Sequence, residues 1–249
     1  MSYRLLAVCS LFALTVTPAL ADESRSLAGS RLELRMGCGV RVEIQPQPGL
    51  SGKVQVEARD GAAGALHFAE GDTAAIDYRP DCGFEADTLE LEIHVPPGMP
   101  IDIREAVAGD YEIGAVGGPL KMRVTGAAEL RAEALSSLDL DCAGAAEIRV
   151  EQLDGPGLIG LHGGGDLTIA GGTMPKLKLE THGAGEIQID GGEIALLDIS
   201  MAGAGNAEIH AAVKDASLEI IGIGRIAVDK VTGKVRRSIV GLGAIDIDS

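Results

Sequence analysis

Apolar and polar residues alternate along most of this chain with a period of two, and the alternating stretches recur about every nineteen residues. A glycine marks the same point in each repeat. The spacings between successive glycines are 18, 19, 20, 20, 19 and 19 residues. These leading glycines are Gly126, Gly144, Gly163, Gly183, Gly203, Gly222 and Gly241. A degenerate earlier copy spans Val107 to Ile113.

Alignment on the leading glycine shows apolar residues at fixed positions on both sides of it. Two residues before it stand Val124, Cys142, Leu161, Thr181, Met201, Ile220 and Ile239, and four after it stand Leu130, Ile148, Leu167, Ile187, Ala207, Ile226 and Ile245. Such alternation predicts two short strands per repeat, each with one face inward. Stacked about 4.8 Å apart, the repeats would bury continuous aliphatic rows. We predict an all-β chain with a parallel β-solenoid (β-helix), right-handed, over residues 98–249.

The region before this repeat lacks the nineteen-residue period. Residues 31–44, 53–58, 74–78 and 89–95 alternate like strands and are separated by turns rich in Pro and Gly. Pro96-Pro97-Gly98 is the expected junction. We predict that residues 22–97 form a β-rich region that covers the N-terminal end of the solenoid, where strand edges would otherwise be bare.

The first residues have the pattern of a secretory signal peptide, predicted at residues 1–21. Arg4 precedes an apolar stretch from Leu5 to Val16, and Ala19-Leu20-Ala21 supplies the small residues of a cleavage site. No later segment is apolar enough to be a membrane helix. The chain is therefore expected to be exported, to the periplasm or to the outer membrane and cell surface.

Composition narrows the classes of function. The formal charge is −16, and removal of Arg4 with the signal makes it −17, which disfavours nucleic acid as a partner. Trp is absent and only three Phe and three Tyr occur, which counts against an aromatic sugar-binding cleft. The Gly-rich runs precede strands and not helices, so they are not phosphate or dinucleotide loops. We expect no cofactor and no enzymatic activity.

Three cysteines follow the signal. Cys38 and Cys82 both sit in Gly-bearing turns and are the expected disulfide in an oxidising compartment. Cys142 falls in an inward row of the repeat, which predicts a buried thiol without a disulfide partner.

The runs His182-Gly183-Ala184-Gly185-Glu186-Ile187 and Ala202-Gly203-Ala204-Gly205-Asn206 resemble the serine-glycine-serine-glycine-acid signature of the auto-transporter adhesin head GIN domain family. The resemblance covers residues 30–249. It implies a β-helical fold and a periplasmic, outer-membrane or surface location, and little about chemistry. The serines that flank the first glycine in the family are here Thr, Ala, His, Ile or Leu. A role that depends on those hydroxyls is therefore not carried over.

Two outward rows contain candidate ligands. Three residues after the leading glycine stand Glu129, Glu147, Asp166 and Glu186, which form either a solvated face or a row for cations. His162 and His182 occupy equivalent positions in neighbouring repeats. With Asp166 and Glu186 they would form a divalent-metal site, and the alternative is two surface histidines.

The last two repeats are apolar where earlier ones are small or polar. Ile221, Ile223, Val240 and Leu242 predict a partner or self-association surface, unless these side chains turn inward or the chain end covers them. The resulting hypothesis is an exported, non-enzymatic solenoid that presents a surface for a cell-envelope partner or for adhesion. Divalent-metal binding is the first alternative. A polysaccharide-acting β-helix enzyme is the second, and it requires a groove that holds a basic residue beside paired carboxylates.

Overall fold

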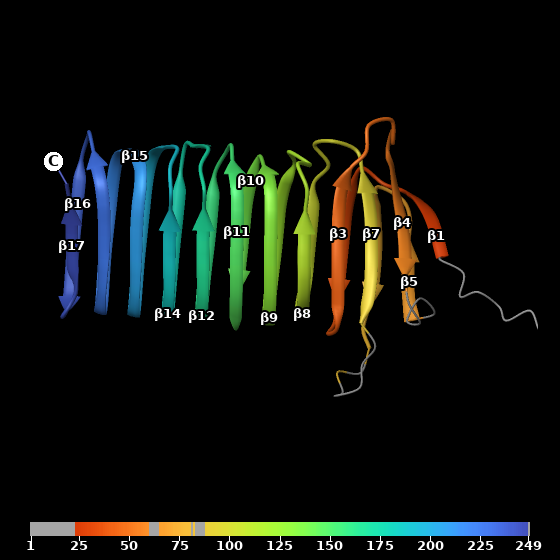
Figure 1. Ribbon diagram of the computed structural model, residues 1–249, viewed down its shortest axis with the longest axis horizontal. Coiled ribbons are helices and arrows are strands. Elements are labelled where there is room, and N and C mark those ends of the chain that lie inside the picture. The colour runs from red at the N-terminus through yellow and green to blue at the C-terminus, as the bar shows by residue number, and fades with distance from the viewer. Residues whose placement is uncertain (1–22, 60–64, 81, 83–87, 249) are drawn as a thin grey trace, which may run out of the picture.

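The structure, a computed structural model, describes residues 23–59, 65–80, 82 and 88–248. The predicted signal peptide lies outside these residues. The C-terminal part is a parallel β-solenoid whose coils stand side by side along one long axis (Figure 1). Its strands are β8 (Ile101–Ile113), β9 (Pro119–Leu135), β10 (Ser137–Cys142), β11 (Ala145–Leu153), β12 (Gly157–Ile169), β13 (Thr173–Met174), β14 (Leu177–Ile189), β15 (Glu193–Val231), β16 (Val235–Gly241) and β17 (Ala244–Ile247).

Equivalent residues of successive coils are backbone partners, which confirms the predicted solenoid and its repeat. Leu120 pairs with Leu138, which pairs with Gly157, and Gly157 pairs with Leu177. The solenoid makes about seven turns of about 20 residues. Its coil segments start at Ile101, Leu120, Leu138, Gly157, Leu177, Leu197, Ala216 and Val235. The right-handed winding stays a prediction.

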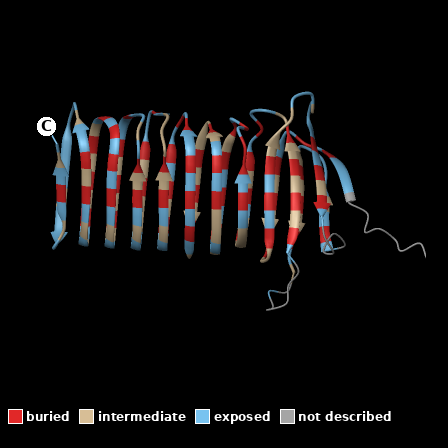
Figure 2. Cartoon of the chain, in the orientation of Figure 1, coloured by how far each residue is buried: buried red, intermediate tan, exposed pale blue. Residues whose placement is uncertain are grey.

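The interior consists of aliphatic rows that run along the axis, and buried and exposed residues alternate along the coils that precede β16 (Figure 2). One row contains Met122, Leu140, Ile159, Leu179, Ile199 and Leu218, each at most 2% exposed. Among the described residues, the only buried side chains with a polar group besides Cys142 are Tyr78 and Tyr111. The Tyr111 hydroxyl has no hydrogen-bond partner within the described part of the chain, and burial raises the pKa of this phenol above its usual range.

Close approach of neighbouring coils explains the leading glycines. A Cβ atom on Gly144 would lie 2.0 Å from the carbonyl oxygen of Gly126, and one on Gly183 would lie 2.1 Å from that of Gly163. Gly183 also has a φ of 137°, a conformation that L side chains rarely adopt. The corner therefore requires glycine mainly because of space, and in later coils also because of backbone conformation.

The N-terminal region contains β1 (Glu23–Ala28), β2 (Arg31–Met36), β3 (Val40–Pro46), β4 (Lys53–Arg59), β5 (Leu66–Ala69), β6 (Thr73–Tyr78) and β7 (Leu89–Val95). Strands β2 and β3 pair in parallel with β8, and β6 and β7 pair in parallel with β2 and β3. Strands β1, β4 and β5 pair antiparallel and complete this end. The parallel ladders thus continue across residue 98. The division into domains there stays a prediction.

Chain order and axial order differ in this region. The coil of β2 and β3 lies between β8 and the coil of β6 and β7, although β6 and β7 precede β8 in sequence. Cys38 and Cys82 lie in the turns of these two stacked coils and form the predicted disulfide, with Cα atoms 5.7 Å apart and a sequence separation of 44. The bond joins two neighbouring coils at their corners. Cys142 is buried and free, as predicted.

Thiol titration checks this cysteine arrangement. Burial raises the pKa of the Cys142 thiol, so the native protein without residues 1–21 should react very slowly with a thiol reagent at pH 8. Unfolding without reductant should expose one thiol per chain, and unfolding with reductant should expose three. Rapid reaction of one thiol in the native state would contradict the burial of Cys142.

Replacement of a corner glycine tests the close approach of the coils. We expect Gly144→Ala to lower the free energy of unfolding by about 3 kcal/mol, because its Cβ atom would overlap the backbone of the preceding coil. Gly164→Ala is the matched control, since a Cβ there would meet nothing closer than 3.6 Å. Denaturant unfolding monitored by circular dichroism measures both. Equal effects of the two substitutions would contradict the packing described here.

Candidate binding surface

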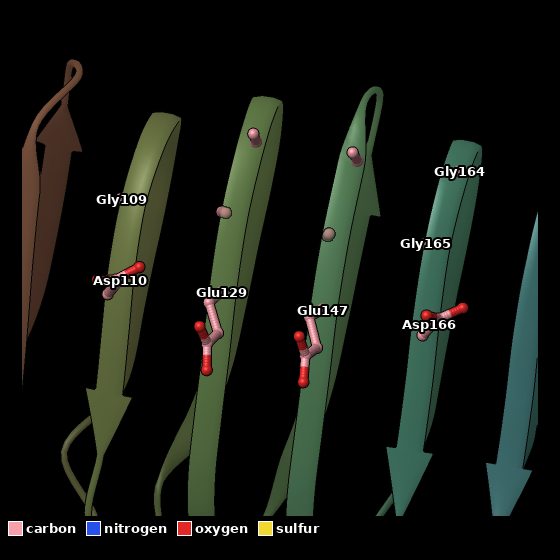
Figure 3. Close-up of a pocket in the computed structure, with 11 residues that line it drawn as sticks. Gly109, Asp110, Glu129, Glu147, Gly164, Gly165 and Asp166 are labelled. Atoms are coloured by element: carbon pink, nitrogen blue, oxygen red, sulfur yellow. The ribbon is translucent and has the colours of Figure 1, made fainter.

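One outward row of the solenoid is acidic in five successive coils, and we call Asp110, Glu129, Glu147, Asp166 and Glu186 the acidic row. Backbone register places each beside the next, about 4.8 Å apart. Figure 3 shows the first four carboxylates on neighbouring coils. Alignment of the repeats on the leading glycine predicted four of these residues, from Glu129 to Glu186. Asp110 was missed because its coil belongs to the degenerate copy of the repeat.

The acidic row borders a shallow groove of about 490 Å³ along the glycine corner. Small residues line the groove, and at Gly109 and Gly165 a Cβ atom would lie within 3.0 Å of a neighbouring coil. Four successive coils contribute Gly109, Ala127 and Ala128, Ala145 and Ala146, and Gly164 and Gly165. A ligand placed along the corner would therefore contact peptide groups and small side chains, with the carboxylates at one edge (Figure 3).

The negative charge of this row is only partly compensated. Glu129 is paired with Arg131, and Asp110 lies 3.8 Å from Arg41. Asp166 accepts a hydrogen bond of 3.1 Å from the backbone N–H of Glu186. Glu147 forms no ion pair among the described residues. Equal charges on adjacent coils repel, so a cationic ligand along the row would relieve an existing repulsion.

A second groove, of about 540 Å³, adjoins the acidic row and shares Glu147 with it. Arg131 and Arg149 line it beside Glu133 and Glu151. A basic residue beside carboxylates is the feature that the polysaccharide-enzyme alternative requires, and that alternative stays a prediction. Both arginines stand five residues after a leading glycine, so stacking brings them into register. Each is already ion-paired, Arg131 with Glu129 and Arg149 with Glu151 at 2.7 Å.

The strand segments that precede the corner form a face whose charges are paired, and we call it the compensated face. Lys121 lies 2.8 Å from Asp139, and Arg123 lies 3.3 Å from Asp141. The hydrogen bond to Asp139 raises the pKa of Lys121, and the bond from Lys178 lowers the pKa of Glu180. The same face contains Asp198, the backbone partner of Lys178, and Glu219, which accepts a hydrogen bond from Ser238, so side chains of both signs occur together on it.

His162 and His182 lie together on the solvent side of the compensated face. They are backbone partners, and their rings stack with centroids 5.0 Å apart. The His162 ring lies over Gly160, since a Cβ there would be 3.2 Å from its Nε2 atom. The same Nε2 is 3.8 Å from Asp141 Oδ1. The predicted proximity of the two histidines is therefore present.

The four residues of the predicted metal site form two separate pairs, the two histidines and the two carboxylates. Asp166 and Glu186 are backbone partners, but they follow the corner whereas the histidines precede it. Four residues of extended chain span about 13 Å. Within the described part of the chain, no group of three His, Cys, Asp or Glu residues is placed to hold a metal ion. Metal binding by the set stays a prediction.

The apolar residues of the last two coils are exposed. Ile221 is 46%, Ile223 61%, Val240 60% and Leu242 83% exposed. Neither an inward turn of the corner nor the described end of the chain covers them. Their role as a partner surface stays a prediction. No helix in the described residues is long and apolar enough to cross a membrane.

Comparisons with known proteins agree with this architecture. The family model described as "Putative auto-transporter adhesin, head GIN domain" matches residues 116–247, more than half of the chain. No curated protein shows significant similarity to the chain.

Solved structures show a similar fold at low sequence identity. A "putative lipid binding protein" from Parabacteroides distasonis has a TM-score of 0.62 at 16% identity, with 91% of this chain and 96% of that chain covered. A putative adhesin from the same species has a TM-score of 0.60 at 17% identity, covering 90% and 96%. A putative adhesin from Bacteroides fragilis has a TM-score of 0.56 at 16% identity, covering 92% and 98%.

Proposed function

Because the chain belongs to the auto-transporter adhesin head GIN domain family, we propose that it is an exported protein that acts by binding, without catalytic turnover. Its place of action would be the periplasm or the cell surface. The predicted signal peptide supports export, and the aliphatic rows that fill the interior leave the outer faces for recognition. The ligand would be a cationic segment of a cell-envelope or surface partner.

The observation that carries this proposal is the acidic row. Five carboxylates in register form a line of about 20 Å, four steps of about 4.8 Å. An extended basic peptide or an amine-bearing polymer carries closely spaced positive charges and could lie along the small-residue groove. The carboxylates stand on strands that backbone hydrogen bonds hold rigid, so little conformational entropy of the protein would be lost on binding.

Binding of a decalysine peptide, followed by fluorescence anisotropy in low salt, tests the proposal. The variant Glu129→Gln/Glu147→Gln/Asp166→Asn should weaken binding on the order of 10-fold, because three carboxylates that face the ligand are removed. The peptide should be recovered intact.

The matched control removes the same charge from the compensated face, with Asp139→Asn/Asp198→Asn/Glu219→Gln. It should change affinity by less than about 3-fold, since surface charges away from the ligand are screened. Equal losses in the two variants would mean that only net charge matters, and the proposal would fail. Cleavage of the peptide would also refute a role without turnover.

Divalent-metal binding is the second candidate, and the stacked pair of His162 and His182 favours it. Rotation of the two exposed rings would direct one nitrogen of each toward a shared zinc ion. Asp141 lies 3.8 Å from His162 and would become a third ligand only after its side chain and the two rings move, since these groups are not placed around one point in the described structure.

Zinc should then raise the melting temperature of the protein, and His182→Ala should abolish the rise. His210→Ala is the control, because His210 pairs with Asp229 at 3.0 Å elsewhere on the surface and should not matter. A melting temperature that does not respond to zinc would exclude this candidate.

A further inference from the structure

Exposed apolar side chains are concentrated at the C-terminal end of the solenoid. The described residues contain eight large hydrophobic side chains that are exposed, and six of them lie between residues 221 and 242. We call these six the terminal patch: Ile221, Ile223, Val235, Ile239, Val240 and Leu242. None of the eight lies at the N-terminal end. Such a concentration of exposed apolar side chains at one end is typical of a surface that binds another protein.

Two parts of the terminal patch meet at the last glycine corner. Val235 and Ile239 continue the inward rows of Ala216 and Ile220, and no further coil covers them among the described residues. Val240 is the partner of Ile221, and Leu242 donates a backbone hydrogen bond to Gly222. The terminal patch therefore extends over both the open end of the solenoid and the adjoining corner of the last coil.

The last coil also has an unpaired backbone edge. Among the described strands, β16 and β17 each pair only with β15, so their outer N–H and C=O groups are free to accept another strand. The N-terminal end differs, since β1, β4 and β5 pair antiparallel there. A head-to-tail stack would thus have to join two unlike edges, whereas a two-fold arrangement joins equal ones.

The charges of the last coil are self-complementary. Arg236 and Arg237 lie on β16, and Asp246 lies on β17 with Asp248 directly after it, so the coil has no net charge although the whole chain carries −16. Arg236, Arg237 and Asp248 form no ion pair among the described residues. The chain turns over at the corner, so β16 and β17 lie on the two faces of the coil (Figure 1). A two-fold axis parallel to the strands places β16 beside the β17 strand of a second copy.

We propose that two copies of this chain form a closed dimer through their last coils, with β16 of each beside β17 of the other. The dimer joins two solenoids end to end and buries Val235 and Ile239 as interior residues. Arg237 continues the inward row of Leu218 between them, so its long side chain would extend to the rim of the interface. The dimer also brings Arg236 near Asp248 of the second copy. The acidic rows stay exposed on both halves, and because this axis exchanges the two faces of the coil, they lie on opposite sides of the dimer.

Mass in solution tests the dimer, measured by sedimentation equilibrium on the chain without residues 1–21. Twice the chain mass is expected. Val240→Lys/Leu242→Lys should raise the dissociation constant on the order of 100-fold, because charged residues replace central apolar contacts. The control Leu158→Lys/Leu196→Lys changes the two exposed hydrophobic residues outside the patch, at 47% and 40%, and should leave the mass unchanged.

Charge reversal tests the orientation. Arg236→Asp should weaken the dimer, and Arg236→Asp with Asp248→Arg should restore it, because the pair is then exchanged across the interface. A wild-type monomer at high concentration, or an open series of oligomers, would overturn the proposal. Equal loss in the Leu158/Leu196 control, or failure of the charge exchange to restore the dimer, would overturn it as well. Circular dichroism establishes that each variant is folded.

Discussion

Backbone pairing between successive coils is the constraint on which the rest of this structure depends. Once residue n is paired with its equivalent about 20 residues later, every side chain stands directly beside the side chain of the same repeat position. The coils approach so closely at the corner that a Cβ on Gly144 would lie 2.0 Å from a carbonyl oxygen. Inward positions thus become aliphatic rows, and corner positions become glycine or alanine.

The same register determines the chemistry of the surface. A single acidic residue per repeat would be a dispersed surface charge in another fold, but here Glu129, Glu147 and Asp166 become a line of neighbours. The compensated face shows the opposite use of stacking, because Lys121 and Asp139 alternate in sign and pair. One rule of assembly therefore produces a face with unbalanced charge and a face without it. Recognition by the former needs no cavity.

The two ends of the solenoid meet the problem of bare strand edges differently. At the N-terminal end the chain places β2 and β3 between two other coils, adds antiparallel strands, and joins neighbouring corners through Cys38 and Cys82. At the C-terminal end Val240 and Leu242 remain exposed beside unpaired backbone. The chain itself covers the strand edges at the N-terminal end. In the proposed dimer a second copy covers them at the C-terminal end, which agrees with the apolar exposure there.

The sequence by itself determined the solenoid, its repeat, the inward rows, the Cys38–Cys82 bond and the burial of Cys142. The solenoid features follow from local periodicity, because a period-two pattern repeated every nineteen residues has one way to bury its apolar positions. The Cys38–Cys82 bond follows instead from two Gly-bearing turns in a chain predicted to be exported. The sequence also identified four of the five acidic-row residues and the neighbouring histidines, because residues at the same position in successive repeats become spatial neighbours.

Only the tertiary structure decided the rest. The order of the N-terminal coils is not the order of the sequence, and no periodic signal marks the pairing of β2 with both β6 and β8. The grouping of Arg131 and Arg149 into a groove, and the separation of Asp166 from His162 by the corner, depend on the side of the coil to which each strand turns. Periodicity gives the register of a row, whereas the direction of the chain at each corner is set by packing between coils.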